Sequence, residues 1–186
     1  SRITMPEGID CYDNNPNPDF DYWNQCCGAW NMFSTRAFYQ TVVRSVIGLD
    51  FDHGGLTVYP RSGKEYTIRN LHMLGRTFDV ALQGRGQYVQ QIIINGTVLQ
   101  GTHKIPMDLL REHNQVTVQR AQKPSTPIVL RCVNGGSLTN YRLDGEMLAA
   151  DVELPGHAVL KLYTDAPVML TVDNGQPKML APDANG

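Results

Sequence analysis

The chain has 186 residues, of which 41% are hydrophobic and 18% charged, and its formal net charge is −2. This composition is typical of a folded domain that buries its own core. The charge near zero and the absence of any Lys/Arg block argue against nucleic acid as a partner, and no apolar run is long enough to span a membrane.

The first predicted element is an irregular loop. The stretch "MPEGIDCYDNNPNPDFDYW", residues 5–23, is dense in Pro, Asn and Asp, which favour turns. Its acidic residues are Glu7, Asp10, Asp13, Asp19 and Asp21. Their oxygens suit calcium, but the spacing is not that of an EF-hand loop, and Pro16 and Pro18 interrupt it. We therefore expect no calcium site here and interpret most of these acids as turn formers.

A long helix follows the loop. We expect it to run from Asn24 to Ile47, with Gly48 as its C-terminal stop. Apolar side chains surround this helix on nearly all sides, broken only by a narrow polar seam that includes Arg36 and Arg44. Such a helix needs packing partners on several sides, which a single sheet does not supply.

From Gly54 onward apolar and polar residues alternate, a pattern that predicts strands. The segments are "GLTVYP", "EYTIRNLHML", "RTFDVAL", "YVQQIIINGTVLQ", "QVTVQR", "PIVLRCV", "SLTNYRLDGEML", "AVLKLY" and "VMLTVD". Turns are expected at Asn95-Gly96, Asp144-Gly145 and Asn174-Gly175, and "IPMDLLREHN" favours a short helical turn or loop. The regular spacing predicts a mainly β fold, an antiparallel β-sandwich preceded by a loop and one long α-helix.

The cysteines and histidines predict neither a metal site nor a cofactor. Cys11, Cys26, Cys27 and Cys132 show no zinc-type spacing, so free thiols are favoured, while a disulfide from Cys11 stays open. None of the five histidines (His53, His72, His103, His113 and His157) has a second His or Cys at ligand spacing. The glycine-rich "QGRGQ", residues 83–87, precedes no helix and predicts a turn between strands.

One short stretch suits a sugar pocket. Tyr22, Trp23, Asn24 and Gln25 combine aromatic faces, which stack on sugar rings, with amides, which bind hydroxyl groups. An equally weighted alternative makes Trp23 a hydrophobic staple and Asn24 the helix N-cap. Further along, Asp52 and His53 are expected to orient a turn, with a phosphate or sugar contact left open.

The stretch "TRAFYQTVVRSVIGLDFDHGGLTVYPR" resembles a junction in (α/α)6-barrel glycoside hydrolases and phosphorylases of the glucoamylase-like clan. There a last barrel helix ends in glycine, an acidic turn follows, and a "GL-x-(V/I)-x-P" strand opens a C-terminal β domain. The matching elements here are Val46–Leu49, Asp50–Asp52 and Gly55–Pro60. "IIINGTVLQGTHKIP" is also similar to a hairpin of those domains, so the resemblance covers roughly residues 20–120.

The resemblance implies that residues 1–53 are the terminal loop and last helix of a helical barrel, and that residues 54–186 are a C-terminal β-sandwich domain. The function implied is that of the C-terminal structural portion of a carbohydrate-active enzyme, a glycoside hydrolase acting on oligosaccharides or glycans. The partners implied are carbohydrate and, through the helix Asn24–Ile47, the remainder of the barrel or a partner subunit.

In that clan the general acid and base come mostly from earlier barrel loops. The chain alone is therefore expected to lack a complete active site, no catalytic residue is assigned, and a catalytic carboxylate among residues 7–21 stays open. A periplasmic or extracellular location suits a parent that degrades glycans. The alternative is a self-standing carbohydrate-binding or scaffold module without catalysis; against it, Trp23 and Trp30 both precede the strands.

Overall fold

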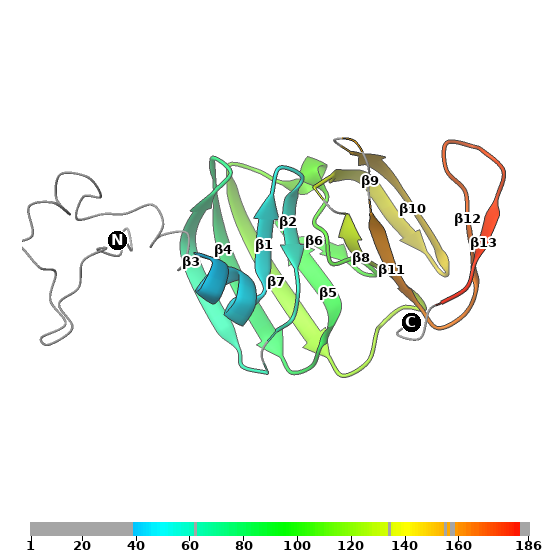
Figure 1. Cartoon of the computed structure of the whole chain (residues 1–186). Coiled ribbons are helices and arrows are strands. Elements are labelled where there is room, and N and C mark those ends of the chain that lie inside the picture. The colour runs from blue at the N-terminus through cyan, green and yellow to red at the C-terminus, as the bar shows by residue number, and fades with distance from the viewer. Residues whose placement is uncertain (1–38, 62, 134, 155, 157–158, 183–186) are drawn as a thin grey trace, which may run out of the picture. The chain divides into compact units, whose positions relative to one another are not determined.

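The computed structural model describes residues 39–182, except residues 62, 134, 155 and 157–158. The chain divides into two compact units, Ser1–Val46 and Ile47–Gly186. The second unit holds every described strand and is mainly β, as the alternating pattern predicts (Figure 1).

The described part of the predicted helix is η1 (Tyr39–Ile47), which has π-helical rather than α-helical geometry. It ends where the sequence predicts, because Gly48 follows with a φ of +89°, a conformation that glycine adopts without steric cost. The residues from Asn24 to Phe38 lie outside the described part of the chain.

The larger sheet of the β unit has five strands in the order β3-β4-β7-β5-β6. These strands are β3 (Tyr66–Met73), β4 (Arg76–Gly84), β5 (Tyr88–Ile94), β6 (Thr97–Leu99) and β7 (His113–Ala121). All neighbours pair antiparallel except β4 and β7, which are parallel from Thr77 opposite His113 to Gly84 opposite Arg120. The purely antiparallel expectation therefore fails at one pair, because β7 inserts between two strands that are consecutive in the chain.

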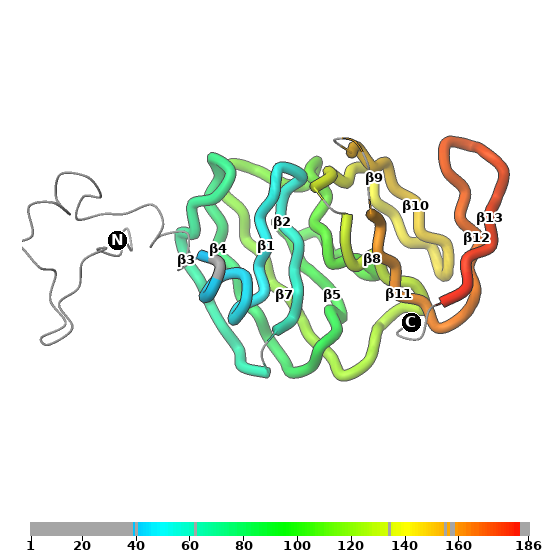
Figure 2. Tube along the Cα trace, viewed as in Figure 1, coloured from blue at the N-terminus to red at the C-terminus, as the bar shows by residue number. Residues whose placement is uncertain are grey.

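A second layer forms around a short extended segment, Gly101–Ile105, which we call the connector. On one side Val58 N donates to His103 O at 2.8 Å, and on the other His103 N donates to Leu130 O at 2.8 Å. These bonds join the β1–β2 hairpin to the β8–β11 pair, and the chain path can be followed in Figure 2. The strands are β1 (Leu49–Asp52), β2 (Gly55–Val58), β8 (Ile128–Val133) and β11 (Leu160–Thr164).

The core of the β unit lies between these two layers. Figure 1 shows the β1–β2 hairpin in front of the five-stranded sheet, and the rings of Phe51 and Phe78 meet edge to face with centroids 5.1 Å apart. Side chains of both layers are fully buried, among them Leu49, Leu56, Val58, Ile92, Ile94 and Val118. Burying each such side chain contributes roughly 1.5–3 kcal/mol, so this face-to-face packing is the main stabilising contact.

The C-terminal part of the unit consists of two further hairpins. β9 (Ser137–Asp144) pairs with β10 (Met147–Glu153), and their apolar side chains pack on a buried cluster of Leu130, Val133 and Leu138. β12 (Val168–Leu170) pairs with β13 (Lys178–Leu180). Neither β1 nor β13 is expected from the sequence, and β1 includes Asp50–Asp52, which the resemblance assigns to an acidic turn.

The predicted turns are present. Asn95 and Gly96 have φ values of +51° and +89° and close the β5–β6 hairpin, as an Asn-Gly pair predicts. Gly145, with a φ of +58°, lies in the β9–β10 turn, and Asn174 lies between β12 and β13. The helical turn expected near residue 107 is η2 (Met107–Leu109), and residues 85–87 connect β4 to β5 without a helix.

Candidate functional site

The sugar-pocket residues expected from the sequence, Tyr22, Trp23, Asn24 and Gln25, lie outside the described residues, as do the five loop acids of residues 7–21. Their roles stay predictions.

The entry of the chain into the β unit is tightly fixed at Gly48. Tyr59 N donates to Gly48 O at 2.6 Å, which ties the residue after η1 to the end of β2. A β-carbon placed on Gly48 would overlap the carbonyl oxygen of Tyr59. Positive φ and close backbone approach both require glycine here, so Gly48 is held against the residue that follows β2.

A partly buried ion pair holds the turn that follows β1. Lys104 Nζ lies 2.7 Å from Asp52 Oδ1, and the same oxygen accepts a hydrogen bond from Gly54 N at 2.9 Å. The Lys104 side chain has no exposed surface, whereas the Asp52 side chain is 30% exposed. A buried ammonium requires a partner, so Asp52 fixes both the turn and the connector. The expectation that Asp52 orients the turn is confirmed.

The connector carries two further buried polar residues. The Thr102 hydroxyl donates to Lys104 O at 2.8 Å and accepts from Lys104 N at 3.0 Å, which satisfies the backbone locally. His103 is 2% exposed, and its Nδ1 has no hydrogen-bond partner among the described residues. Burial lowers the pKa of His103 to about 4, and the nearby Arg131 guanidinium acts in the same direction. The ring is therefore neutral at pH 7.

Tyr59 and Cys132 meet beside this connector. Burial raises the pKa of Tyr59 above its usual range, and a hydrogen bond with the Cys132 thiol and the carboxylates of Asp50 and Asp52 act in the same direction. Cys132 is a free thiol, and the other three cysteines lie outside the described residues. The hydrogen bond links the residue that follows β2 to β8.

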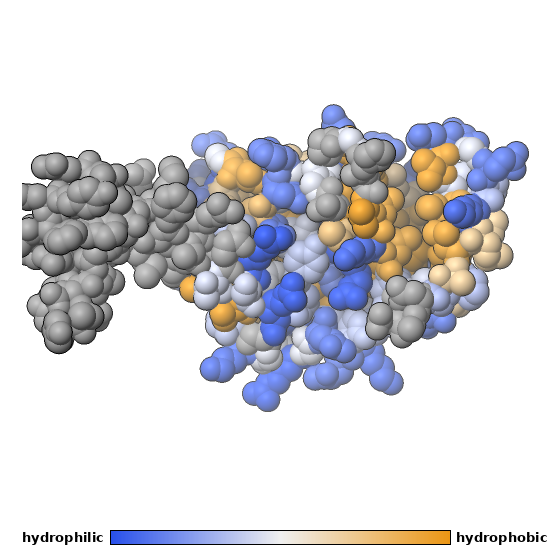
Figure 3. Space-filling view, viewed as in Figure 1, coloured by the Kyte–Doolittle hydropathy of each residue, from blue (hydrophilic) through white to orange (hydrophobic). Residues whose placement is uncertain are grey.

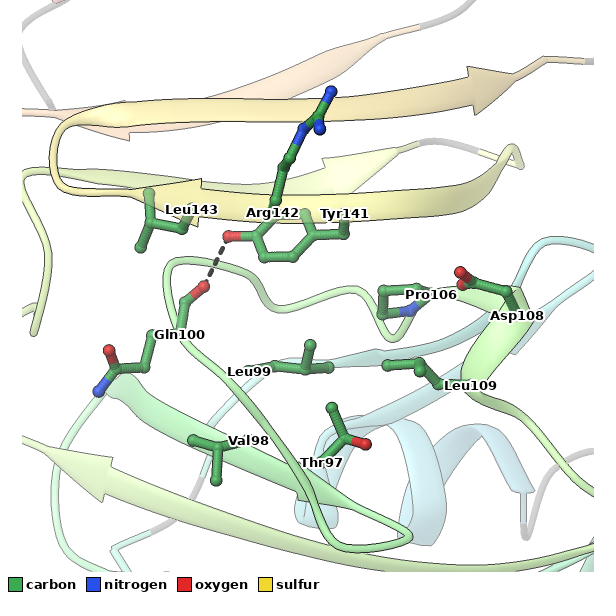
Figure 4. Close-up of a pocket in the computed structure, with 10 residues that line it drawn as sticks. All are labelled: Thr97, Val98, Leu99, Gln100, Pro106, Asp108, Leu109, Tyr141, Arg142 and Leu143. Atoms are coloured by element: carbon green, nitrogen blue, oxygen red, sulfur yellow. Dashed lines mark hydrogen bonds between the residues drawn. The ribbon is translucent and has the colours of Figure 1, made fainter.

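The pocket in Figure 4 lies between the edge strand β6, η2 and β9, and its volume is about 330 Å³. The Tyr141 hydroxyl crosses it and donates to Gln100 O at 2.6 Å, while Arg142 points away from that contact. Asp108 Oδ2 accepts from Asn140 N at 3.3 Å. Burial raises the pKa of Tyr141 above its usual range. Tyr141 thus joins β9 to the residue after β6, and Asp108 joins η2 to β9.

A second, more polar pocket of about 340 Å³ lies at the end of the five-stranded sheet. Asn95 Nδ2 donates to Asn114 Oδ1 at 3.1 Å, and Asn114 Nδ2 donates to Arg111 O at 2.7 Å. Asp79 Oδ1 accepts from Asn70 N at 2.7 Å. These side chains satisfy backbone groups where β4 and β7 begin and β5 ends, so their first role is to fix the strand ends.

A third pocket, of about 460 Å³, has a wall of two aromatic rings, Tyr88 of β5 and Tyr163 of β11. The remaining pocket of the four, beside Asn140, surrounds the irregularity in the β9–β10 pairing. Each of the four is lined by a single carboxylate, in turn Asp108, Asp79, Asp165 and Asp151. The carboxyl pair that glycoside hydrolysis requires is therefore not assembled in any of these pockets.

Within residues 39–182, apart from the undescribed positions, no group of three or more His, Cys, Asp or Glu side chains is placed to hold a metal ion. No helix in that part of the chain is long and apolar enough to cross a membrane. Compared with known proteins, the chain matches no protein family, no curated protein and no solved structure.

Sequence reasoning missed the buried Lys104 and the tyrosine pair. Lys104 lies in "GTHKIP", which has no alternating period to predict burial, and lysine is among the residues least often buried. Tyr88 and Tyr163 belong to strands that are distant in the sequence, so only the pairing of the two layers brings them together. A single tyrosine near the start or end of a strand does not by itself indicate a binding site.

Proposed function

We propose that the chain is the C-terminal structural portion of a carbohydrate-active enzyme, a glycoside hydrolase acting on oligosaccharides or glycans. In this proposal the β unit contributes no catalytic carboxyl pair. It braces the segment that precedes it, and the predicted helix Asn24–Ile47 packs against the remainder of a helical barrel or a partner subunit.

The observation that carries the proposal is the fixed junction at Gly48. Gly48 is hydrogen-bonded to Tyr59, and the ion pair between Asp52 and Lys104 holds the next turn to the connector. A domain whose task is to brace a neighbour needs such a rigid entry point, because a flexible link transmits no support. The resemblance of residues 20–120 to the barrel–sandwich junction supports the same role.

The test uses the whole protein encoded by the natural gene, compared with the 186-residue chain. We expect the whole protein to release reducing sugar from a panel of oligosaccharides and the chain alone to release none. Lys104→Met, introduced into the whole protein, should lower the temperature at which activity is lost. The matched change at an exposed lysine, Lys178→Met, should leave that temperature unchanged.

Two results would contradict the proposal. One is a whole protein that lacks any further helical segment and any activity on sugars. The other is hydrolysis by the 186-residue chain alone, since that activity requires a carboxyl pair within the chain itself.

A further inference from the structure

We propose that the pocket between Tyr88, Tyr163 and the loop of residues 122–127 binds a neutral carbohydrate. We call it the tyrosine pocket. It is separate from the junction at Gly48, and the inference stands whether or not the β unit braces a barrel. The two are tested by different measurements, binding by this chain for the pocket and catalysis by the whole protein for the brace.

The aromatic wall of the tyrosine pocket spans both layers of the β unit. Tyr88 begins β5 in the five-stranded sheet, and Tyr163 lies on β11 in the second layer. Their rings meet edge to face, with centroids 5.8 Å apart and an interplanar angle of 66°. Both side chains are partly exposed and line the pocket. The edge of one ring covers a face of the other, and a ring face left uncovered by this contact can stack on the C–H face of a sugar unit.

The opposite wall is polar and pre-organised. Ser125 Oγ donates to Gln90 O at 2.7 Å, and Thr126 Oγ1 donates to Ile128 O at 2.8 Å. These bonds tie the loop of residues 122–127 to β5 and β8, and Pro124 and Pro127 restrict its backbone. A loop that is already ordered loses little entropy when a ligand binds, which favours affinity in an open pocket.

The charges of the pocket favour a neutral ligand. Lys123 and Asp165 are the ionisable lining residues apart from the tyrosines, and their opposite charges cancel. A phosphate or an acidic sugar would require an excess of positive charge, which this pocket does not have. The exposed ammonium, the carboxylate and the Gln122 amide instead provide donors and acceptors of both kinds, which suits hydroxyl groups.

The volume and the lining of the pocket fit the same class of ligand. Its volume of about 460 Å³ lies within the range of roughly 300–1,000 Å³ that small-molecule sites occupy. Polar side chains from residues 122–126 and Asp165 make up most of the lining beside the two rings, so a purely apolar ligand would leave them without water. A sugar ring, apolar on its faces and polar at its edge, satisfies both walls.

The main rival occupant is a proline-rich peptide, since tyrosine-lined grooves also bind polyproline II helices. Such grooves are lined mainly by aromatic side chains, whereas the second wall here is a loop of amide, hydroxyl and charged groups. The carbohydrate is therefore the favoured occupant, and the peptide becomes an outcome of the test.

The experiment titrates the 186-residue chain with maltohexaose, cellohexaose and xylohexaose by isothermal calorimetry. We expect saturable binding of at least one of them. Tyr88→Ala and Tyr163→Ala should each weaken it by about tenfold or more, since a lost stacking contact of about 1.4 kcal/mol corresponds to a factor of ten. Tyr88→Phe, which keeps the ring, should retain most of the affinity. Tyr66→Ala on β3, distant from the pocket lining, is the matched control and should leave the affinity unchanged.

Circular dichroism establishes whether each variant is folded. If Tyr88→Ala does not fold, Lys123→Ala and Asp165→Ala carry the test, because both residues are exposed and line the pocket. Both should weaken binding. The inference is overturned if none of the three hexasaccharides binds saturably, if binding is unchanged by every pocket variant, or if a polyproline peptide binds and the sugars do not.

Discussion

The two halves of the β unit stabilise their strands in different ways. From Leu49 to Ala121 the strands lie in two facing layers, with fully buried apolar side chains and a buried lysine between them. From Ser137 onward the chain forms the β9–β10 and β12–β13 hairpins, and β11 between them pairs back with β8. Most of the exposed large apolar side chains among the described residues belong to this part: Met147, Val159, Leu160, Met169, Val172 and Met179. Figure 3 shows apolar surface gathered over the C-terminal strands.

This comparison shows which part of the β unit is held in one arrangement by close contacts and which part should accept substitutions. In the first half, backbone contacts at Gly48 and the Asp52–Lys104 pair admit one arrangement, and a change there affects both layers. In the second half, a two-stranded pair such as β12–β13 depends on its own cross-strand contacts and is weakly stable alone. Substitutions should therefore be costly at these first-half contacts and cheap in the β12–β13 hairpin.

The largest effect is expected from Gly48→Ala. The substitution places a β-carbon against the Tyr59 carbonyl oxygen and forces a non-glycine residue to a φ of +89°. We expect a loss of about 3–5 kcal/mol in the free energy of unfolding, measured by urea denaturation. The control is Gly75→Ala, where φ is +70° but nothing lies within 4 Å, and the loss should be about 1 kcal/mol. Equal losses in the two variants would show that the junction is not tightly packed.

The ion pair should respond asymmetrically to removal of its partners. Asp52→Asn leaves a fully buried ammonium without its counter-charge and should cost about 3 kcal/mol of unfolding free energy. Lys104→Met should cost less, because the methionine is apolar and Asp52 is partly exposed to water. Urea denaturation of both variants measures the difference, with the exposed Asp144→Asn as control. A larger loss of unfolding free energy in Lys104→Met than in Asp52→Asn would contradict this account of the ion pair.

The sequence predicts the local elements of this fold better than their arrangement. Asn95-Gly96 forms its turn because positive φ is a local preference, and Gly48 ends η1 for the same reason. The insertion of β7 between β4 and β5 depends on contacts between distant residues, which alternation does not encode. The second layer depends on the connector, whose five residues carry no strand period.

The candidate sites show the same contrast between local contacts, which the sequence predicts, and contacts between distant residues, which it does not. Asp52 was expected to orient a turn, and its sequence neighbour Gly54 supplies one of the two donors it binds. The other donor, Lys104, is distant in sequence, and so are the two rings of the tyrosine pocket. Pairing between distant segments creates these sites, so a single sequence does not reveal them.

His103 should make the stability of the first half depend on pH. Its pKa is about 4 in the folded chain and about 6.5 when unfolded, so between these values the unfolded chain binds more protons. The free energy of unfolding should fall by about 3 kcal/mol as the pH decreases from 7 to 4 through this group alone. His103→Leu should remove that part of the dependence in urea denaturation at several pH values, whereas the exposed His113→Leu should not. An unchanged pH profile in His103→Leu would rule out this contribution.

The smallest effects are expected in the β12–β13 hairpin. Met169 and Met179 face each other across the two strands, and both are more than half exposed. Met169→Thr and Met179→Thr remove little buried surface and keep strand propensity, so each should change the unfolding free energy by less than about 0.5 kcal/mol.

In the first half, Ile92→Thr places a hydroxyl in the closed core and should cost about 3 kcal/mol. Thermal unfolding of the three variants compares the halves directly. A loss in Met169→Thr as large as in Ile92→Thr would show that a surface of the hairpin is covered when the chain folds, and the contrast between the two halves would then fail.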